Sequence, residues 1–203
     1  TSLSVGKPNL RINKLGGISL NKNIFRLLCV LVVLCLGFNP GIVLAAQELP
    51  FDVESKSALL LDHNSGEIIY EKNADEKLAI ASITKIMTIL LALEAIENGL
   101  ISEDDEVHVS AHSQSMGGST AFLEEGEIFP VSTILKAIIV ASANDASVAI
   151  AEKISGSHEG FVQKMNQKAQ ELGMDNTNFT NCTGLPDENH YSTARDVAIM
   201  SRE

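Results

Sequence analysis

The sequence predicts an α+β domain in which a few early strands are followed by a helix-rich stretch. Two short apolar runs flank a turn near residue 65, and from residue 78 onward apolar residues recur at helical spacing. The strands needed to complete a sheet are not found in the 203 residues, which begin with Thr1 and stop inside an expected helix. We therefore expect a piece of a longer protein that lacks the C-terminal strands of its domain.

The first expected element is a β-hairpin that follows an extended segment at 47–55. The runs "SALLLD" (57–62) and "EIIYEKN" (67–73) are typical of strands. Between them, Asn64-Ser65-Gly66 supplies residues that favour a tight turn.

The longest apolar stretch, 78–96, predicts a helix because its apolar residues follow helical spacing on more than one face. A helix that is apolar nearly all round belongs in a core, and Asn98-Gly99 should end it. After it, "VHVS" (107–110) predicts a short strand, and 111–127 predicts a loop, a strand and a turn.

Capping residues divide the rest of the chain into four further helices. A side chain that accepts hydrogen bonds from backbone N–H groups begins a helix, and a glycine commonly follows its end. The expected positions are Ser132 before 133–142, Gly156 at the end of 145–156, Ser157 and Gly173 around 158–173, and Thr193 with Asp196 before the last helix.

Residues 1–46 have the pattern of a secretory signal peptide. They contain no acidic residue and five basic ones, followed by an apolar run at 27–36 and small residues at Ala45-Ala46. A membrane anchor is the alternative, but the apolar run is too short and too broken for a spanning helix. We therefore expect an exported protein that functions outside the cytoplasm, with a truncated domain at 47–203.

The remaining charges exclude nucleic acid as a partner. All 26 acidic residues lie after the leader, against ten of the 15 basic ones, so no basic stripe is present to neutralise phosphates. Of the three cysteines, only Cys182 lies after the leader, so no intrachain disulfide is expected there. No histidine or basic cluster lies near it in sequence, which favours a buried, inert thiol over a nucleophile.

One charged residue, Lys85, interrupts the apolar run "IASITKIMTI" at 80–89, three residues after Ser82. Residues at this spacing share one face of a helix, so the lysine amine can reach the serine hydroxyl. Burial lowers the pKa of a lysine, and a neutral amine beside a hydroxyl is a base that can activate it as a nucleophile. Ser82 and Lys85 are therefore candidate catalytic residues, although a lysine extending from a surface helix gives the same tetrad.

A second candidate element, Ser142-Ala143-Asn144, lies at a break between two apolar helical stretches. Polar side chains in such surroundings need hydrogen-bond partners. Their hydroxyl and carboxamide could bind the lysine amine and hold a peptide substrate. Helix capping by Asn144 or Asp145 is the alternative.

Together, Ser82-Ile83-Thr84-Lys85 and Ser142-Ala143-Asn144 resemble two motifs of the penicillin-recognising serine enzymes. The segments "ASITKIMT", "ASANDASVAIAE", "FVQKMNQKAQELGM", "NTNFTNCTGLP" and "YSTARDVAIM" resemble the D-alanyl-D-alanine carboxypeptidases of the S11 peptidase family. The resemblance runs from about Ser57 to the end of the chain. It implies the β-lactamase/transpeptidase-like fold of serine acyl-enzymes.

By this resemblance, Ser82 is the nucleophile, Lys85 its general base and Ser142 a proton relay, while Asn144 binds the substrate amide and the lysine. The implied substrates are peptidoglycan stem peptides that end in D-Ala-D-Ala, and β-lactams are the implied covalent inhibitors. No cofactor and no metal is implied, and the histidines show no ligand spacing. A C-terminal segment outside this sequence could hold the protein at the membrane periphery.

The sequence departs from the family in one respect. The third family motif, Lys-Thr-Gly, lies on a later edge strand and occurs nowhere in residues 1–203. In the family it binds the substrate carboxylate and places a second oxyanion donor. We therefore expect the intact protein to be an enzyme and this piece to be inactive.

Two other functions remain open from the sequence. A β-lactamase would share the serine and lysine, but the Glu-x-x-x-Asn spacing expected of a class A deacylation site does not follow Asn144. A non-catalytic peptidoglycan-binding envelope protein could keep the same fold. The intact pair of Ser82 and Lys85 argues against a decayed site.

Overall fold

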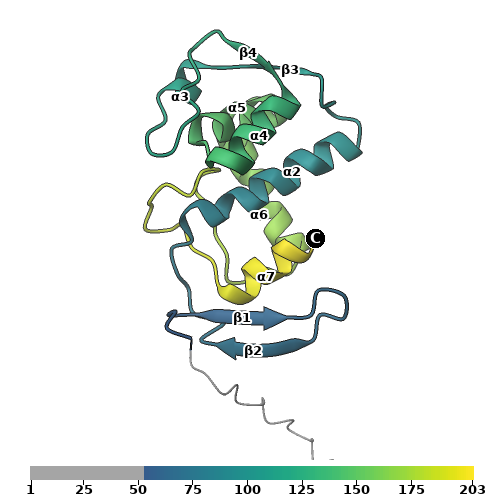
Figure 1. The fold of residues 1–203 in the computed structure, drawn as a ribbon, viewed down its shortest axis with the longest axis vertical. Coiled ribbons are helices and arrows are strands. Elements are labelled where there is room, and N and C mark those ends of the chain that lie inside the picture. Colours follow the sequence, from purple (N-terminus) through teal and green to yellow (C-terminus); the bar gives the residue numbers. More distant parts are fainter. Residues whose placement is uncertain (1–52) are drawn as a thin grey trace, which may run out of the picture. The chain divides into compact units, whose positions relative to one another are not determined.

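The computed structural model describes residues 53–203, so the signal peptide expected at 1–46 lies outside the described residues. Two strands come first and helices dominate the rest of the chain (Figure 1). The elements in chain order are β1 (Ala58–Leu61), β2 (Ile68–Lys72), the 3-10 turn η1 (Ala81–Thr84), α2 (Lys85–Glu97), β3 (Glu106–His108), α3 (Ala111–Gln114), β4 (Ile128–Pro130), α4 (Val131–Ala141), α5 (Asn144–Ser155), α6 (His158–Glu171) and α7 (Ala194–Arg202).

The strands form two separate antiparallel pairs. In the first, β1 and β2 make the expected hairpin, with Ala58 opposite Lys72 and an irregular register near Leu61. In the second, β3 pairs with β4. Helix α7 lies against the first hairpin (Figure 1). The strands and helices agree with the expected α+β class.

Helix α5 is the centre of the helical part. It contacts α2, α3, α4 and α6, and its residues 144–151 are all buried. On one side, Ala146, Ala149 and Ile150 pack with side chains of α4 and β3. On the other side, Val148 and Ala151 pack with Phe161 and Met165 of α6 and with α2. The small residues of α5 let its neighbours approach closely and so hold α2 in place.

The expected helix over 78–96 is divided in the structure. Residues 78–80 are not helical, a 3-10 turn follows at Ala81–Thr84, and α2 begins only at Lys85. Leu78 instead exchanges backbone hydrogen bonds with Ser192, which keeps the chain extended before the turn. The end of the helix is as expected, because Asn98 is the C-cap and Gly99 has a φ of +69°.

Two expectations between β3 and α4 were wrong. The strand expected within 111–127 is absent: α3 occupies 111–114, and the N–H groups of Ala121 and Leu123 donate to the Asp145 carboxylate. Ser132 does not cap α4, whose N-cap is Pro130. The N–H groups of Val131 and Ser132 donate to the carbonyls of Asp105 and Glu103, so loop backbone replaces the side-chain cap.

The later caps follow the sequence prediction. Ser157 accepts from the N–H of Gly160, and Thr193 accepts from the N–H of Asp196. The Asp196 carboxylate does not complete the expected capping box, because it accepts hydrogen bonds from the backbone and hydroxyl groups of Asn176 and Thr177. It thereby ties α7 to the segment that follows α6.

Candidate active site

The two residues of the Ser-x-x-Lys tetrad lie where the 3-10 turn passes into α2. Ser82 is exposed within the turn, whereas Lys85 is the first residue of α2 and only 3% exposed. Their side chains meet, with 3.3 Å between Lys85 Nζ and Ser82 Oγ. Ala81, directly before the serine, has a φ of +42°, a conformation that non-glycine residues rarely adopt and that is often found at functional sites.

The second partner of the lysine amine comes from the segment after α6. Lys85 Nζ donates a hydrogen bond of 2.8 Å to the backbone carbonyl of Thr183. Burial lowers the pKa of Lys85 from its ordinary value, because the charged form loses its hydration. The neighbouring thiol of Cys182 is also buried, and burial raises its pKa to about 12. Cys182 is therefore a neutral thiol, as expected, and it adds no charge beside the amine at neutral pH.

The segment 181–185 is fastened to the first turns of α2. The Thr88 hydroxyl donates to the carbonyl of Cys182 at 2.8 Å, next to the Thr183 carbonyl that Lys85 holds. Gly184 has a φ of +83° and lies against the Ala81 carbonyl, where a Cβ would overlap the oxygen. This segment completes the surroundings of Lys85, and no role for it was predicted from the sequence. The Thr-Gly-Leu-Pro run at 183–186 was the available signal, since glycine in such a run indicates a turn or a close approach.

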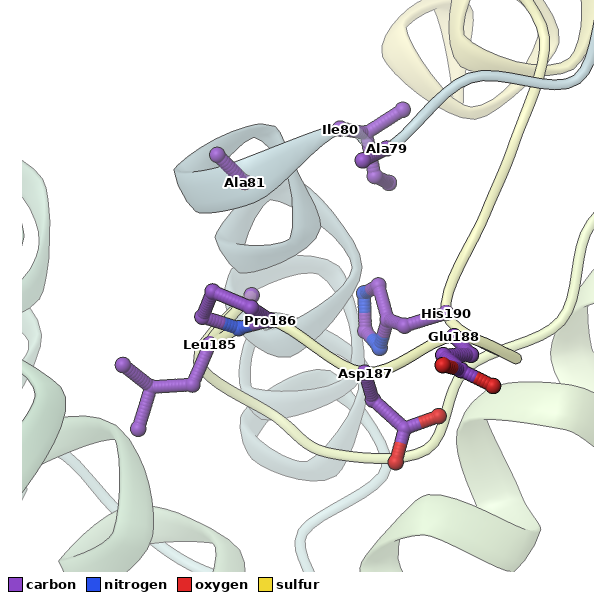
Figure 2. A pocket seen from close by; sticks show the side chains of 9 residues that line it. Ala79, Ile80, Ala81, Leu185, Pro186, Asp187, Glu188 and His190 are labelled. Carbon is purple, nitrogen blue, oxygen red and sulfur yellow. The ribbon is translucent and has the colours of Figure 1, made fainter.

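A cavity adjoins the turn that carries Ser82. Its walls are residues 79–81 on one side and 184–190 on the other, and most are apolar, with Asp187 and Glu188 at the edge (Figure 2). His190 fixes the far wall. Its Nδ1 accepts from the N–H of Thr180 at 3.1 Å, so its Nε2–H donates to the Thr84 hydroxyl at 2.7 Å. His190 therefore connects the turn at 81–84 with the segment after α6, and both walls of the cavity are held in place.

Ser142 and Asn144 lie at the junction of α4 and α5. Ser142 is the C-cap of α4 and has a φ of +53°, and Asn144 is the first residue of α5. The Asn144 amide Nδ2 donates to the Gly117 carbonyl at 2.7 Å. The resemblance implied a contact of Asn144 with Lys85, but no hydrogen bond joins these two side chains among the described residues. Their roles as substrate-binding and proton-relay groups remain predictions.

The alternative for this junction, capping of the helix by Asn144 or Asp145, was wrong, because the N-cap of α5 is Ala143 and no side chain caps it. The Asp145 carboxylate accepts from the N–H groups of Ala121 and Leu123, at 3.0 and 3.1 Å, and from the N–H of Ala146. Asp145 therefore holds the loop before β4 against the start of α5. This loop also carries Gly117, so it is part of the support of Asn144.

Metal-binding side chains do not cluster within residues 53–203: no three His, Cys, Asp or Glu residues gather in a way that could hold an ion. The site consists instead of a hydroxyl, an amine and the backbone groups around them. Such an arrangement can carry out nucleophilic chemistry on a carbonyl group, with the amine as base.

A family model and a curated relative both match most of this chain. Residues 43–203 match the family described as peptidase S11, D-alanyl-D-alanine carboxypeptidase. The D-alanyl-D-alanine carboxypeptidase DacF of Bacillus subtilis is 57% identical over 150 residues, which are 74% of this chain and 39% of that protein. The chain thus spans about two fifths of the length of this curated relative.

Solved structures show the same similarity. The D-alanyl-D-alanine carboxypeptidase DacD from Francisella tularensis has a TM-score of 0.74 at 36% identity, covering 76% of this chain and 37% of that one. Penicillin-binding protein D2 from Listeria monocytogenes, solved in an ampicillin-bound form, has a TM-score of 0.65 at 29% identity, covering 73% of this chain and 60% of that one. The expected transpeptidase-like fold is therefore confirmed for the part of the chain that the structure describes.

Proposed function

The chain belongs to the S11 family of D-alanyl-D-alanine carboxypeptidases, and from this premise we propose that the whole protein removes the terminal D-alanine from peptidoglycan stem peptides through an acyl-enzyme on Ser82. The observation that supports this most strongly is the buried amine of Lys85 beside the exposed hydroxyl of Ser82. A lysine that merely extended from a surface helix would keep its amine in water, whereas this amine is almost fully covered.

Acylation begins with proton transfer inside this pair. Neutral Lys85 accepts the Ser82 hydroxyl proton while Oγ attacks the carbonyl carbon between the two terminal D-alanines. Ser142 relays this proton from Lys85 to the nitrogen of the leaving D-alanine, the C–N bond breaks, and Lys85 is neutral again. The rest of the peptide stays on Ser82 as an ester. Asn144 holds the substrate amide through its side chain. The Asn144 carboxamide has a second N–H on Nδ2 and the Oδ1 oxygen, and neither is used in the hydrogen bond to Gly117.

Deacylation repeats the proton transfer with water as the nucleophile. Lys85 takes a proton from the water as it attacks the ester carbonyl. The C–O bond to Ser82 then breaks, and protonated Lys85 returns the proton to Oγ, which restores both side chains. The peptide leaves one D-alanine shorter. Burial lowers the pKa of Lys85, which raises the fraction of the amine that is neutral and can act as the base in both steps.

The proposal places the rest of the substrate site outside these 203 residues. The backbone N–H of Ser82 is one oxyanion donor, and a strand with Lys-Thr-Gly would supply the second and bind the substrate carboxylate. Since the chain spans 39% of the length of a curated relative, such a strand has ample room in the rest of a full-length protein. Loss of one oxyanion donor costs about 100- to 1000-fold in rate, so residues 47–203 alone should be inactive.

The proposed location is outside the cytoplasmic membrane, because the substrate is cell-wall peptide and the leader at 1–46 has the pattern of a signal peptide. Within residues 53–203, none of the helices has the length and apolar character needed to cross a membrane. N-terminal sequencing of the protein from the cell envelope should find a start near Ala46 or Gln47. A mature chain that retained Cys29 and Cys35 would contradict the export proposal.

Labelling of the full-length protein with a fluorescent penicillin tests the catalytic proposal. A penicillin should acylate Ser82, in line with the ampicillin-bound form of the Listeria relative. We expect one labelled peptide that contains Ser82, no label on Ser82→Ala, and release of D-alanine from a peptide ending in D-Ala-D-Ala. A protein that stays unlabelled would be a binding module, and rapid turnover of the penicillin would indicate a β-lactamase.

A further inference from the structure

The carboxamide of Asn181 organises the segment that faces Lys85. Its Oδ1 accepts three hydrogen bonds: from the N–H of Thr183 at 3.1 Å, from the Thr183 hydroxyl at 2.9 Å and from the N–H of Gly184 at 2.7 Å. Its Nδ2 donates to the carbonyl of Leu185 at 3.0 Å. One side chain therefore fixes the backbone of three residues, Thr183, Gly184 and Leu185.

One of these hydrogen bonds lies on the same peptide group that binds the lysine. The carbonyl of Thr183 and the N–H of Gly184 belong to a single planar peptide unit and point in opposite directions. Asn181 Oδ1 holds the N–H end, and Lys85 Nζ holds the carbonyl end at 2.8 Å. A continuous chain of hydrogen bonds thus leads from Asn181 through this peptide to Lys85 and on to Ser82, 3.3 Å from the amine.

This chain constrains the direction of the amine as well as its place. A neutral amine has two N–H groups and one lone pair at roughly tetrahedral angles. When one N–H is bound to the Thr183 carbonyl, fewer directions are open to the lone pair, and the Ser82 hydroxyl lies 3.3 Å from the same nitrogen. Hydrogen bonds in series also polarise one another, so the bound N–H of Gly184 makes the Thr183 carbonyl a better acceptor.

We propose that Asn181 is a positioning residue for acylation: it orients the Thr183–Gly184 peptide so that the carbonyl holds Lys85 in line with Ser82. The inference rests on the proposed function, in which Lys85 is the general base. Asn181 itself contacts neither Ser82 nor Lys85 through its hydrogen bonds, so it acts through the peptide group between them. The Thr88 hydroxyl, which holds the adjacent Cys182 carbonyl, supports the same segment from α2.

A second asparagine provides a matched control. The Asn166 carboxamide also fixes a neighbouring segment, because Oδ1 accepts from the N–H of Phe179 at 2.9 Å and Nδ2 donates to the carbonyls of Phe179 and Val162. It makes no hydrogen bond to the peptide that holds Lys85. Asn166→Ala should therefore show what the loss of a structural carboxamide does to this fold without touching the base.

The experiment compares Asn181→Ala and Asn166→Ala in the full-length protein. The acylation rate with a fluorescent penicillin is measured across pH, and the reactivity of the Lys85 amine toward acetic anhydride is followed by mass spectrometry. The second readout needs no catalysis, so it reports on the amine even if the protein proves not to be acylated by penicillin. Asn181→Leu, which nearly keeps the side-chain size but cannot accept the hydrogen bond from the Gly184 N–H, serves if Asn181→Ala does not fold.

We expect Asn181→Ala to be acylated about 10- to 100-fold more slowly, as for a reacting group that is slightly misplaced. Burial is the main cause of the lowered pKa of Lys85, so a loosened segment should admit water and move this pKa up toward its ordinary value. The acid limb of the acylation profile and the anhydride titration should shift to higher pH together. A folded Asn181→Ala or Asn181→Leu with the wild-type profile in both readouts would overturn the inference, as would an equal shift in Asn166→Ala.

Discussion

Gly184 lies against the carbonyl of Ala81, the residue directly before the candidate nucleophile, so closely that a Cβ at position 184 would overlap the oxygen. Both residues have positive φ angles, +83° for Gly184 and +42° for Ala81. The two segments can therefore meet only because one has no side chain and the other is held in a rarely adopted conformation. This contact brings the Thr183 carbonyl within reach of Lys85.

Gly184→Ala should displace the 181–185 segment from the turn that carries Ser82. The clash is with backbone, which cannot swing aside as a flexible side chain would. We expect loss of penicillin acylation and a loss of stability greater than the roughly 1–2 kcal/mol that the left-handed backbone alone costs. Gly99→Ala is the control, because Gly99 has a φ of +69° but nothing within 4 Å of its would-be Cβ. Equal losses of acylation and stability in the two variants, measured in the full-length protein, would contradict the proposed close contact.

Lys85→Arg should abolish acylation although the charge is kept. A guanidinium does not lose its proton at working pH, and its planar fork does not fit the place of an amine held by one carbonyl. Loss of a general base typically costs about 100- to 10,000-fold in rate. The exposed Lys136 of α4 is the control, and Lys136→Arg should be labelled like the wild type. Near wild-type acylation of Lys85→Arg would remove Lys85 from the mechanism.

His190 should make the stability of the protein depend on pH. Burial lowers the pKa of this imidazole from 6.5, and Asp187 offsets only part of the effect. The unfolded chain therefore binds the proton first as the pH falls, and the free energy of unfolding decreases from about pH 6.5 down to the lowered folded-state pKa. Above pH 6.5 this contribution is fully present.

His190→Gln should therefore lose less stability than the wild type between pH 8 and pH 5, although it starts from a lower value. The partly buried His158, whose pKa is also lowered by burial, keeps part of the pH dependence in both proteins. His108→Gln is the control, because the His108 side chain is 68% exposed. Urea unfolding at several pH values measures the difference, and identical slopes in wild type and His190→Gln would show that His190 is not the sensitive group.

The parts of the structure that local chemistry determines were predictable from the sequence. The hairpin at 57–73, the caps at Ser157 and Gly173, and the meeting of Ser82 with Lys85 each involve residues close in the chain. Turn residues, capping side chains and helical spacing each involve residues a few positions apart, so these features can be predicted from a single sequence.

The remaining contacts depend on packing between distant segments. Thr183, whose carbonyl binds Lys85, lies 98 residues away in sequence. Because every residue has a backbone carbonyl, the residue type cannot show which one binds the lysine. The 3-10 turn before α2 likewise depends on Leu78 pairing with Ser192, far along the chain. The hydrogen bond from Asn144 Nδ2 to the loop carbonyl of Gly117 is another contact of this kind, because its acceptor lies 27 residues away. Residue types suggested which groups carry the chemistry, and packing decided which groups support them.

The helix that carries Lys85 leaves one apolar stripe in water within residues 53–203. Ile86 and Leu93 are 37% and 52% exposed, and their spacing places them on one face of α2. Ile83 of the preceding 3-10 turn is 45% exposed. On the hairpin, Leu60 and Ile69 are 50% and 48% exposed. Apolar surface costs roughly 25 cal/mol for each Å² left in water, so a few hundred Å² matters against a net stability of about 5–15 kcal/mol.

Residues 47–203 produced alone should therefore be aggregation-prone and should not react with penicillin, whereas the full-length protein should be soluble and reactive. Leu93→Lys tests whether the exposed stripe causes the aggregation, because it should improve the short piece and harm the full-length protein. In the short piece it replaces an exposed leucine and should raise the soluble fraction, measured by sedimentation and size exclusion. In the full-length protein, where we propose that later strands cover this stripe, it buries a charge and should lower the free energy of unfolding by several kcal/mol. A short piece that is monomeric and acylated by penicillin would contradict the proposal, as would a full-length protein whose stability Leu93→Lys leaves unchanged.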